Sequence, residues 1–179
     1  MNPKHTLLSL ALAASSVQAG TPPTANPPRM GYLSCGGAKL VASTTYVDVV
    51  DQDWQTVAQR ITLTPPGRSQ AITLPHEGRP LHQPFLKHVP VLDATVTGWA
   101  CITATDGTPY LYLGYTCTES PLRPKCEGDD REWSRLFDLN GKQLDAGYPH
   151  EGERQSNLMR KLGLGRYVTN GVSMSGISD

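Results

Sequence analysis

The sequence lacks an excess of either charge. Its 16 Lys and Arg residues balance 16 Asp and Glu residues, so the formal net charge is zero at pH 7, and no long run carries one sign. Proteins that bind nucleic acid or an anionic membrane surface normally carry a basic excess, so this balance argues against both partners. The chain also lacks visible internal repeats and any apolar run of the length that a membrane anchor needs.

Motifs for nucleophilic catalysis and for phosphate binding are absent as well. No Gly-x-Ser-x-Gly occurs, and Ser175-Gly176 is interpreted as an ordinary turn. Gly36-Gly37 is not followed by Gly-Lys-Ser or Gly-Lys-Thr, so no phosphate loop is predicted. None of the cysteines lies in a recognisable catalytic motif. We therefore predict that the protein is not an enzyme and has no catalytic residues.

Histidines and carboxylates do gather in two places, but not in the pattern of a known site. Three histidines recur every six residues, at His76, His82 and His88. This spacing matches neither a helical pair nor a zinc signature, so no metal and no cofactor is predicted. A second group of charged residues precedes Trp133, at Asp129, Asp130, Arg131 and Glu132. We interpret it as a solvated loop held by salt bridges rather than as a catalytic carboxylate pair.

The first 19 residues have the parts of a secretory signal peptide. Lys4 gives a positive start, residues 7–14 are apolar, and Val17-Gln18-Ala19 is a small-x-small cleavage site. We predict cleavage after Ala19 and export to the periplasm. No cysteine follows at once, so a lipoprotein is not expected, and the short apolar run does not predict insertion in the membrane.

The exported chain is predicted to fold as one domain behind a short leader. Residues 20–29 are rich in proline and are expected to be extended and flexible. Residues 30–179 are enough for a single β-rich domain with a real core. An even number of cysteines in an oxidising compartment predicts two disulfides. The four residues concerned are Cys35, Cys101, Cys117 and Cys126.

The fold class that the pattern indicates is mainly β, an antiparallel sheet or sandwich of hairpins with one short helix near the C-terminus. Expected strands cover residues 30–35, 39–50, 58–64, 70–74 and 91–104, followed by two hairpins. Residues 51–53 are predicted to form a turn, and residues 76–90 a long loop without periodicity. The helix is expected at 156–162 with Gly163 as its cap, and residues 168–179 could add an edge strand.

Asp106-Gly107 predicts the first hairpin, since this dipeptide suits the positive φ angles of a two-residue turn. Such a turn pairs Thr105 with Thr108 and places Cys101 opposite Tyr112. One face then holds Trp99, Cys101, Tyr110 and Tyr112, and the other Leu111, Leu113, Tyr115 and Cys117. Because side chains alternate, Cys101 and Cys117 point to opposite sides and are not expected to bond. A bulge at the turn would undo this argument.

Two disulfide pairings remain. One joins Cys35 to Cys101 and Cys117 to Cys126, and the other joins Cys35 to Cys117 and Cys101 to Cys126. The first is preferred, because a nearby partner costs less chain entropy to reach.

Asn140-Gly141 predicts a second hairpin that pairs Leu139 with Lys142 and Phe137 with Leu144. One face is then Trp133, Phe137, Leu144 and Tyr148, and the other Glu132, Ser134, Asp138 and Gln143. The expected result is a sheet with one face on the core and one in water.

An exported, disulfide-stabilised β protein without catalytic residues most often acts by binding, so we predict a binding role. Two loops could bind a partner, His76 to Pro90 and Cys117 to Arg131. The second is the better candidate, because a disulfide at its base would order it before a partner arrives and so reduce the entropy lost on association. The predicted partner-binding residues are Glu119, Arg123, Lys125, Asp129 and Asp130. The alternative is that the bridge only stabilises the fold.

The order of features resembles the periplasmic immunity and inhibitor proteins of Gram-negative bacteria. The resemblance rests on the signal peptide, on Tyr-Leu-Ser-Cys-Gly-Gly at 32–37 and on Glu-Trp-Ser-Arg-Leu-Phe-Asp-Leu-Asn-Gly at 132–141. The Tyr-x-x-Cys also resembles the start of lysozyme-inhibitor lipoproteins, although the lipidated cysteine is absent. The resemblance implies a protein that binds and occludes a secreted antibacterial effector, a cell-wall or lipid hydrolase, and it assigns no residue a role.

Two other functions stay open. The first is a non-catalytic envelope protein that binds a ligand or has a structural role, with Trp99, Tyr110 and Tyr112 as an exposed aromatic face. The second is a hydrolase whose catalytic groups have no familiar motif.

Overall fold

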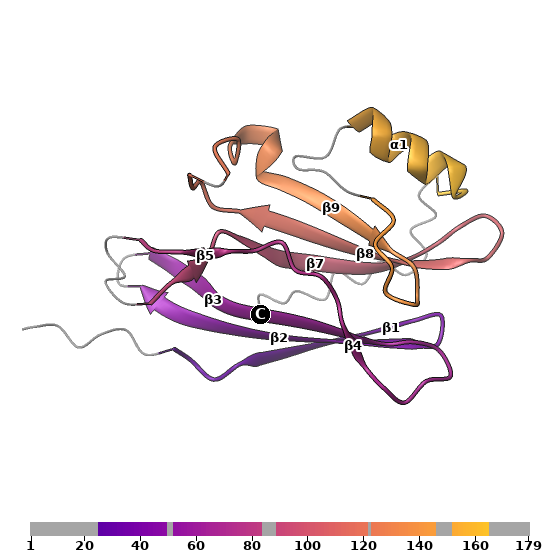
Figure 1. Ribbon diagram of the computed structural model, residues 1–179, viewed down its shortest axis with the longest axis horizontal. Helices are drawn as coiled ribbons and strands as arrows, with labels where there is room; N and C mark the ends of the chain where they lie inside the picture. Colours follow the sequence, from indigo (N-terminus) through magenta and orange to yellow (C-terminus); the bar gives the residue numbers. More distant parts are fainter. Residues whose placement is uncertain (1–24, 50–51, 84–88, 122, 146–151, 165–179) are drawn as a thin grey trace, which may run out of the picture.

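Two antiparallel sheets packed face to face form the body of the protein (Figure 1). The computed structural model describes residues 25–49, 52–83, 89–121, 123–145 and 152–164. The four-stranded sheet has the order β1-β2-β3-β4 and the three-stranded sheet the order β7-β8-β9. The mainly β fold, the single short helix of the described residues and both disulfides agree with the sequence prediction.

The strands of the first sheet are β1 (Arg29–Cys35), β2 (Ala38–Val49), β3 (Gln52–Thr64) and β4 (Ile72–Thr73). Those of the second are β7 (Ala94–Thr103), β8 (Pro109–Cys117) and β9 (Glu132–Phe137). A small ribbon of β5 (Pro80–Leu81) and β6 (Val91–Leu92) lies between them in the chain, followed later by the 3-10 turn η2 (Gly128–Arg131) and the helix α1 (Gly152–Lys161).

Alternation of side chains explains how the two sheets make one core. In β8 the buried residues Leu111, Leu113, Tyr115 and Cys117 follow every second position. Residues of β2 and β3 on the facing sheet alternate in the same way, with Leu40, Ile61 and Leu63 fully buried. Strands that bury one face in a sandwich take this period of two.

Several boundaries differ from the expected ones. The strand β3 starts at Gln52, inside the turn predicted for 51–53, and it continues without interruption to Thr64. The strand expected at 70–74 is only Ile72–Thr73. Within the predicted loop 76–90, Pro80–Leu81 pairs with β6. The edge strand suggested for 168–179 lies outside the described residues.

The helix α1 covers the outer face of the three-stranded sheet, so both faces of β9 are buried (Figure 1). It starts four residues before the expected Ser156 and ends at Lys161, one residue before the expected Leu162. Gly163, the predicted cap, has a φ of +71°. Leu158 and Met159 pack with Leu136 beneath them. The sequence prediction of a sheet with one face in water is therefore wrong for β9.

Both predicted hairpin turns contain three residues instead of two. The Ala104 N–H donates to the Thr108 carbonyl oxygen at 2.8 Å, and Gly107 takes the third position with a φ of +87°. The second hairpin is closed in the same way between Asp138 and Lys142, at 3.0 Å. The extra residue forms a bulge that moves each register by one position.

This shift corrects the predicted faces. Cys101 pairs with Leu111 and Trp99 with Leu113, so both belong to the inner face, while Tyr110 and Tyr112 lie on the face under α1. In the second hairpin Leu144 joins Leu136 under the helix, away from Trp133 and Phe137. Tyr148 lies outside the described residues.

The preferred disulfide pairing is confirmed, although its first premise is wrong. Cys35 bonds Cys101, and Cys117 bonds Cys126. Cys101 and Cys117 share the inner face, but Cys101 is opposite Leu111, and six residues of β8 span about 20 Å. Distance along the strand, not direction, keeps these two cysteines apart.

The turn that joins β1 to β2 packs tightly against the end of the second sheet. Gly36 and Gly37 both have positive φ angles, 54° and 83°. A Cβ added at Gly36 would lie 2.7 Å from Leu139 Cδ1 and would also collide with Pro109. The turn therefore requires glycine for its backbone angle and for its space.

We predict that Gly36→Ala lowers the free energy of unfolding by about 2–4 kcal/mol, because a left-handed backbone angle and a steric clash add together. Gly67→Ala is the control, since Gly67 has a φ of +69° but nothing lies within 4 Å of an added Cβ. Gly67→Ala should lower the free energy of unfolding by only about 1 kcal/mol. Urea unfolding of both variants measures the difference, and equal losses would contradict the packing argument.

Candidate functional site

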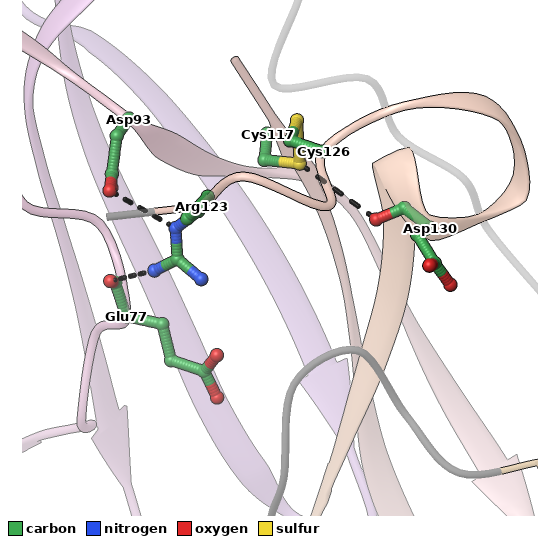
Figure 2. The surroundings of a disulfide bond; sticks show 6 residues. All are labelled: Glu77, Asp93, Cys117, Arg123, Cys126 and Asp130. Atoms are coloured by element: carbon green, nitrogen blue, oxygen red, sulfur yellow. Dashed lines mark hydrogen bonds and ion pairs between the residues drawn. A yellow bond between two sulfur atoms is a disulfide. The ribbon is translucent and has the colours of Figure 1, made fainter. Parts of the chain in front are cut away.

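The disulfide loop, residues 117–126, leaves the end of β8 and leads through η2 to β9. The Cα atoms of Cys117 and Cys126 are 5.9 Å apart. Cys117 Sγ also lies 3.9 Å from the Asp130 carbonyl oxygen (Figure 2). Within the loop, the Arg123 N–H donates to the Ser120 carbonyl oxygen at 2.9 Å, and the Cys126 N–H donates to the Arg123 carbonyl oxygen at 3.1 Å. The loop is thus a succession of hydrogen-bonded turns.

Arg123 is turned into the protein, toward Asp93 and Glu77 (Figure 2). Its side chain is buried, and Arg123 Nε lies 3.2 Å from Asp93 Oδ2. The guanidinium group also donates to the Glu77 carbonyl oxygen, and its central carbon lies 5.1 Å from the centre of the Trp133 ring. The guanidinium group of Arg123, one of the predicted partner contacts, is therefore occupied beneath the loop within the protein itself.

The other predicted contact residues differ in exposure. Glu119 and Lys125 are exposed on the outer side of the disulfide loop, and Asp130 in η2 is half-buried. Asp129 is in the same 3-10 turn, but its side chain lies outside the described residues. The structure thus leaves Glu119 and Lys125 as the two predicted contacts whose side chains face solvent.

A second ion pair, between the buried Arg135 and the partly buried Glu77, lies next to the first. The Arg135 guanidinium group binds both oxygens of the Glu77 carboxylate, and Arg135 is 1 % exposed. Trp133 Nε1 donates to the same carboxylate at 3.1 Å. Because Glu77 also accepts from Arg123 through its main chain, one residue connects the strand β9 with the disulfide loop.

Aromatic rings close this cluster on one side. Tyr115 and Trp133 stack with ring centres 5.3 Å apart, and His76 tilts against Tyr115 at 5.8 Å. Burial raises the pKa of the Tyr115 hydroxyl well above its usual range. Trp133 is 3 % exposed, so its ring is part of the core and is not available to stack on a ligand.

His76 is fixed in one neutral form by its hydrogen bonds. The Gly78 N–H donates to Nδ1 at 3.0 Å, so Nε2 carries the proton and donates to Gln59 Oε1 at 2.8 Å. Gln59 in turn bonds the main chain of Val96 in both directions, at 2.7 and 2.9 Å. Burial lowers the pKa of the His76 imidazole. This network ties the two sheets together through polar groups.

The polar groups of this cluster bind one another and so stabilise the fold. Both carboxylates are paired with arginines, and His76 uses both ring nitrogens in bonds within the protein. In the described part of the chain no group of three His, Cys, Asp or Glu residues could hold a metal ion, and His88 lies outside that part.

The aromatic surface that would have favoured a ligand-binding protein is not present as predicted. Trp99 is fully buried between the sheets, while Tyr110 and Tyr112 are partly buried beside α1. The proposed exposed face of these three residues is therefore wrong.

The sequence contained a signal for part of the cluster. Arg135 alternates with Trp133 and Phe137, so it belongs to the same inner face of β9. A charged residue at a core position needs a partner. Glu77 and Asp93 could not be named as partners, because they are separated from the arginines by 58 and 30 residues.

No family model matches the chain, and neither the curated proteins nor the solved structures give a match. Within the described residues, α1 is the one α-helix, and it is neither long nor apolar enough to cross a membrane.

We predict that Arg123→Met lowers the free energy of unfolding by about 3–5 kcal/mol, because it leaves Asp93 buried without its counter-charge. Asp93→Asn in the same chain should recover at least about 1 kcal/mol, since the amide removes that charge and can still accept from Arg79 N–H. Chemical denaturation gives the free energy of unfolding of wild type, of Arg123→Met and of the double variant. The exposed Arg131→Met should change stability by less than about 0.5 kcal/mol. Equal effects at positions 123 and 131 would show that the ion pair is unimportant.

We also predict that stability falls as the pH decreases from 7.5 to 5.5. The pKa of His76 is lowered in the folded protein, so the unfolded chain takes up the proton first, around the ordinary value of 6.5. His76→Gln should reduce the loss of stability over this range. His82→Gln is the control, because the His82 side chain is exposed. Unfolding curves at both pH values decide the question, and an unchanged loss in His76→Gln would count against the buried neutral imidazole.

Proposed function

We propose that the protein is an exported immunity or inhibitor protein that binds a secreted antibacterial effector and blocks its active site with the disulfide loop. The effector is a cell-wall or lipid hydrolase, and the compartment is the periplasm. The observation that carries the proposal is the double attachment of this loop. The Cys117–Cys126 bond closes its base, and Arg123 anchors its middle to Asp93 and Glu77.

The rigidity of the disulfide loop supports this role, because it lowers the entropy cost of binding a partner. A loop that is already ordered loses little conformational entropy when a partner binds, so more of the contact energy appears as affinity. Glu119, Pro121, Pro124 and Lys125 are exposed on the disulfide loop, and both prolines restrict its backbone further. The anchoring side chain points inward while these residues face outward.

The charges on the loop suit recognition of a specific protein. Glu119 and Lys125 have opposite signs and lie on either side of the buried Arg123. Opposite charges at fixed positions select a partner with the complementary arrangement and disfavour others. Steric occlusion needs no reactive group on the inhibitor, which agrees with the paired state of both carboxylates in the cluster.

The test is capture of the effector by the tagged mature protein from a lysate of its own organism, with identification by mass spectrometry. Wild type is expected to capture one stoichiometric partner with hydrolase activity on isolated cell walls or phospholipid vesicles, and to inhibit it. Glu119→Lys combined with Lys125→Glu exchanges the loop charges without changing the net charge. It should weaken binding at least about ten-fold, as expected for contacts at the centre of an interface.

The matched control exchanges charges elsewhere, with Lys39→Glu and Glu153→Lys. Both residues are exposed, on β2 and on α1, and the net charge is again unchanged. This variant should bind as wild type does. The proposal fails if a folded protein with intact disulfides captures no hydrolase, or if the loop exchange leaves binding unaltered.

A further inference from the structure

Among the described strands, β1 is an edge strand that pairs on one side. It lies at the end of the four-stranded sheet, and β2 is its partner among the described strands (Figure 1). Pro27 and Pro28 precede it, and the Gly36-Gly37 turn ends it. Proline cannot donate to a neighbouring strand, so the edge that can pair is limited to the seven residues of β1.

Large exposed apolar side chains are concentrated on the same sheet. In the described part of the chain they are Met30, Tyr32, Trp54 and Ile72, and all belong to β1, β3 or β4. Tyr32 is 67 % and Met30 49 % exposed, both on the outer face of β1. Tyrosine and methionine are enriched in protein interfaces, whereas an edge that only faces water normally carries charges or proline.

The outer face of this sheet carries no carboxylate next to the edge. Its outward residues on β1 are Met30, Tyr32 and Ser34, and their neighbours on β2 are Ser43, Val41 and Lys39. Arg29 is the one charged residue of β1. The formal net charge of the whole chain is zero, so two copies do not repel each other at long range.

We propose that two copies of the protein pair through β1, antiparallel and centred on Tyr32, and so join their four-stranded sheets into one. Tyr32 is the middle residue of Arg29–Cys35, so a two-fold axis beside it pairs the full length of both strands. This proposal does not depend on the identity of any effector.

The register that results is free of charge conflict. Arg29 lies opposite Cys35 of the second copy, so the two arginines are at opposite ends of the paired strands. Met30 lies opposite Ser34, and the two Tyr32 rings meet at the axis with Val41 behind each of them. Cross-strand aromatic pairs flanked by β-branched residues stabilise antiparallel sheets. The disulfide loop belongs to the other sheet and stays accessible.

Light scattering coupled to size-exclusion chromatography of the mature protein tests the proposal. We expect a dissociation constant of about 1 μM, so the protein concentration is varied over about two decades around that value. Wild type should show twice the mass of one chain at the upper end. Tyr32→Lys should weaken the dimer at least about ten-fold, because two like charges meet at the axis. Its folding is checked by thermal unfolding, and Tyr32 is exposed enough for the change to be tolerated.

Ala58→Lys is the matched control, since Ala58 is exposed on β3 of the same sheet and away from the edge. It should dimerise as wild type does. Tyr32→Cys adds a test of the register, because the two new thiols should form a disulfide across the axis under oxidation, while Ala58→Cys should not. A wild type that is monomeric throughout, or a dimer that Tyr32→Lys leaves intact, would overturn the proposal.

Discussion

Two buried arginines determine how the parts of this protein are held together. Arg135 in β9 and Arg123 in the disulfide loop both reach Glu77, and Arg123 also pairs with Asp93. A buried charge is costly unless its partner is in place, so each arginine requires its carboxylate. They connect the segment before β5, the residue between β6 and β7, the strand β9 and the disulfide loop. The conformation of the disulfide loop is therefore fixed by contacts in the interior of the protein.

The local pattern of the sequence was sufficient for the class of fold. Alternating runs predicted the strands, and Asp106-Gly107 and Asn140-Gly141 located the hairpins. The same dipeptides serve two-residue turns and three-residue turns with a bulge, and this difference reverses a strand's faces. The predicted faces failed for that reason. The disulfide pairing was still correct, because it also rested on the short separation of Cys117 and Cys126.

The site could be predicted only in part, since its interactions join distant segments. The disulfide loop was found from the cysteines, and Glu119 and Lys125, two of its predicted contact residues, are exposed. Arg123 looked like a surface residue because charged side chains in polar loops usually are. Its burial depends on a contact with Asp93, which is 30 residues away in the sequence. A local sequence pattern cannot predict such a contact. Long-range pairs between charged groups are the feature that sequence reasoning misses.

Hydrogen exchange of the free protein tests the central claim, that the disulfide loop is ordered before any partner binds. The Arg123 and Cys126 amides bond within the loop, so their exchange reports its opening. In wild type they should exchange nearly as slowly as core amides of β8. In Arg123→Met, with both disulfides intact, they should exchange at least about ten-fold faster than the core. Fast exchange of these amides in wild type would contradict the account.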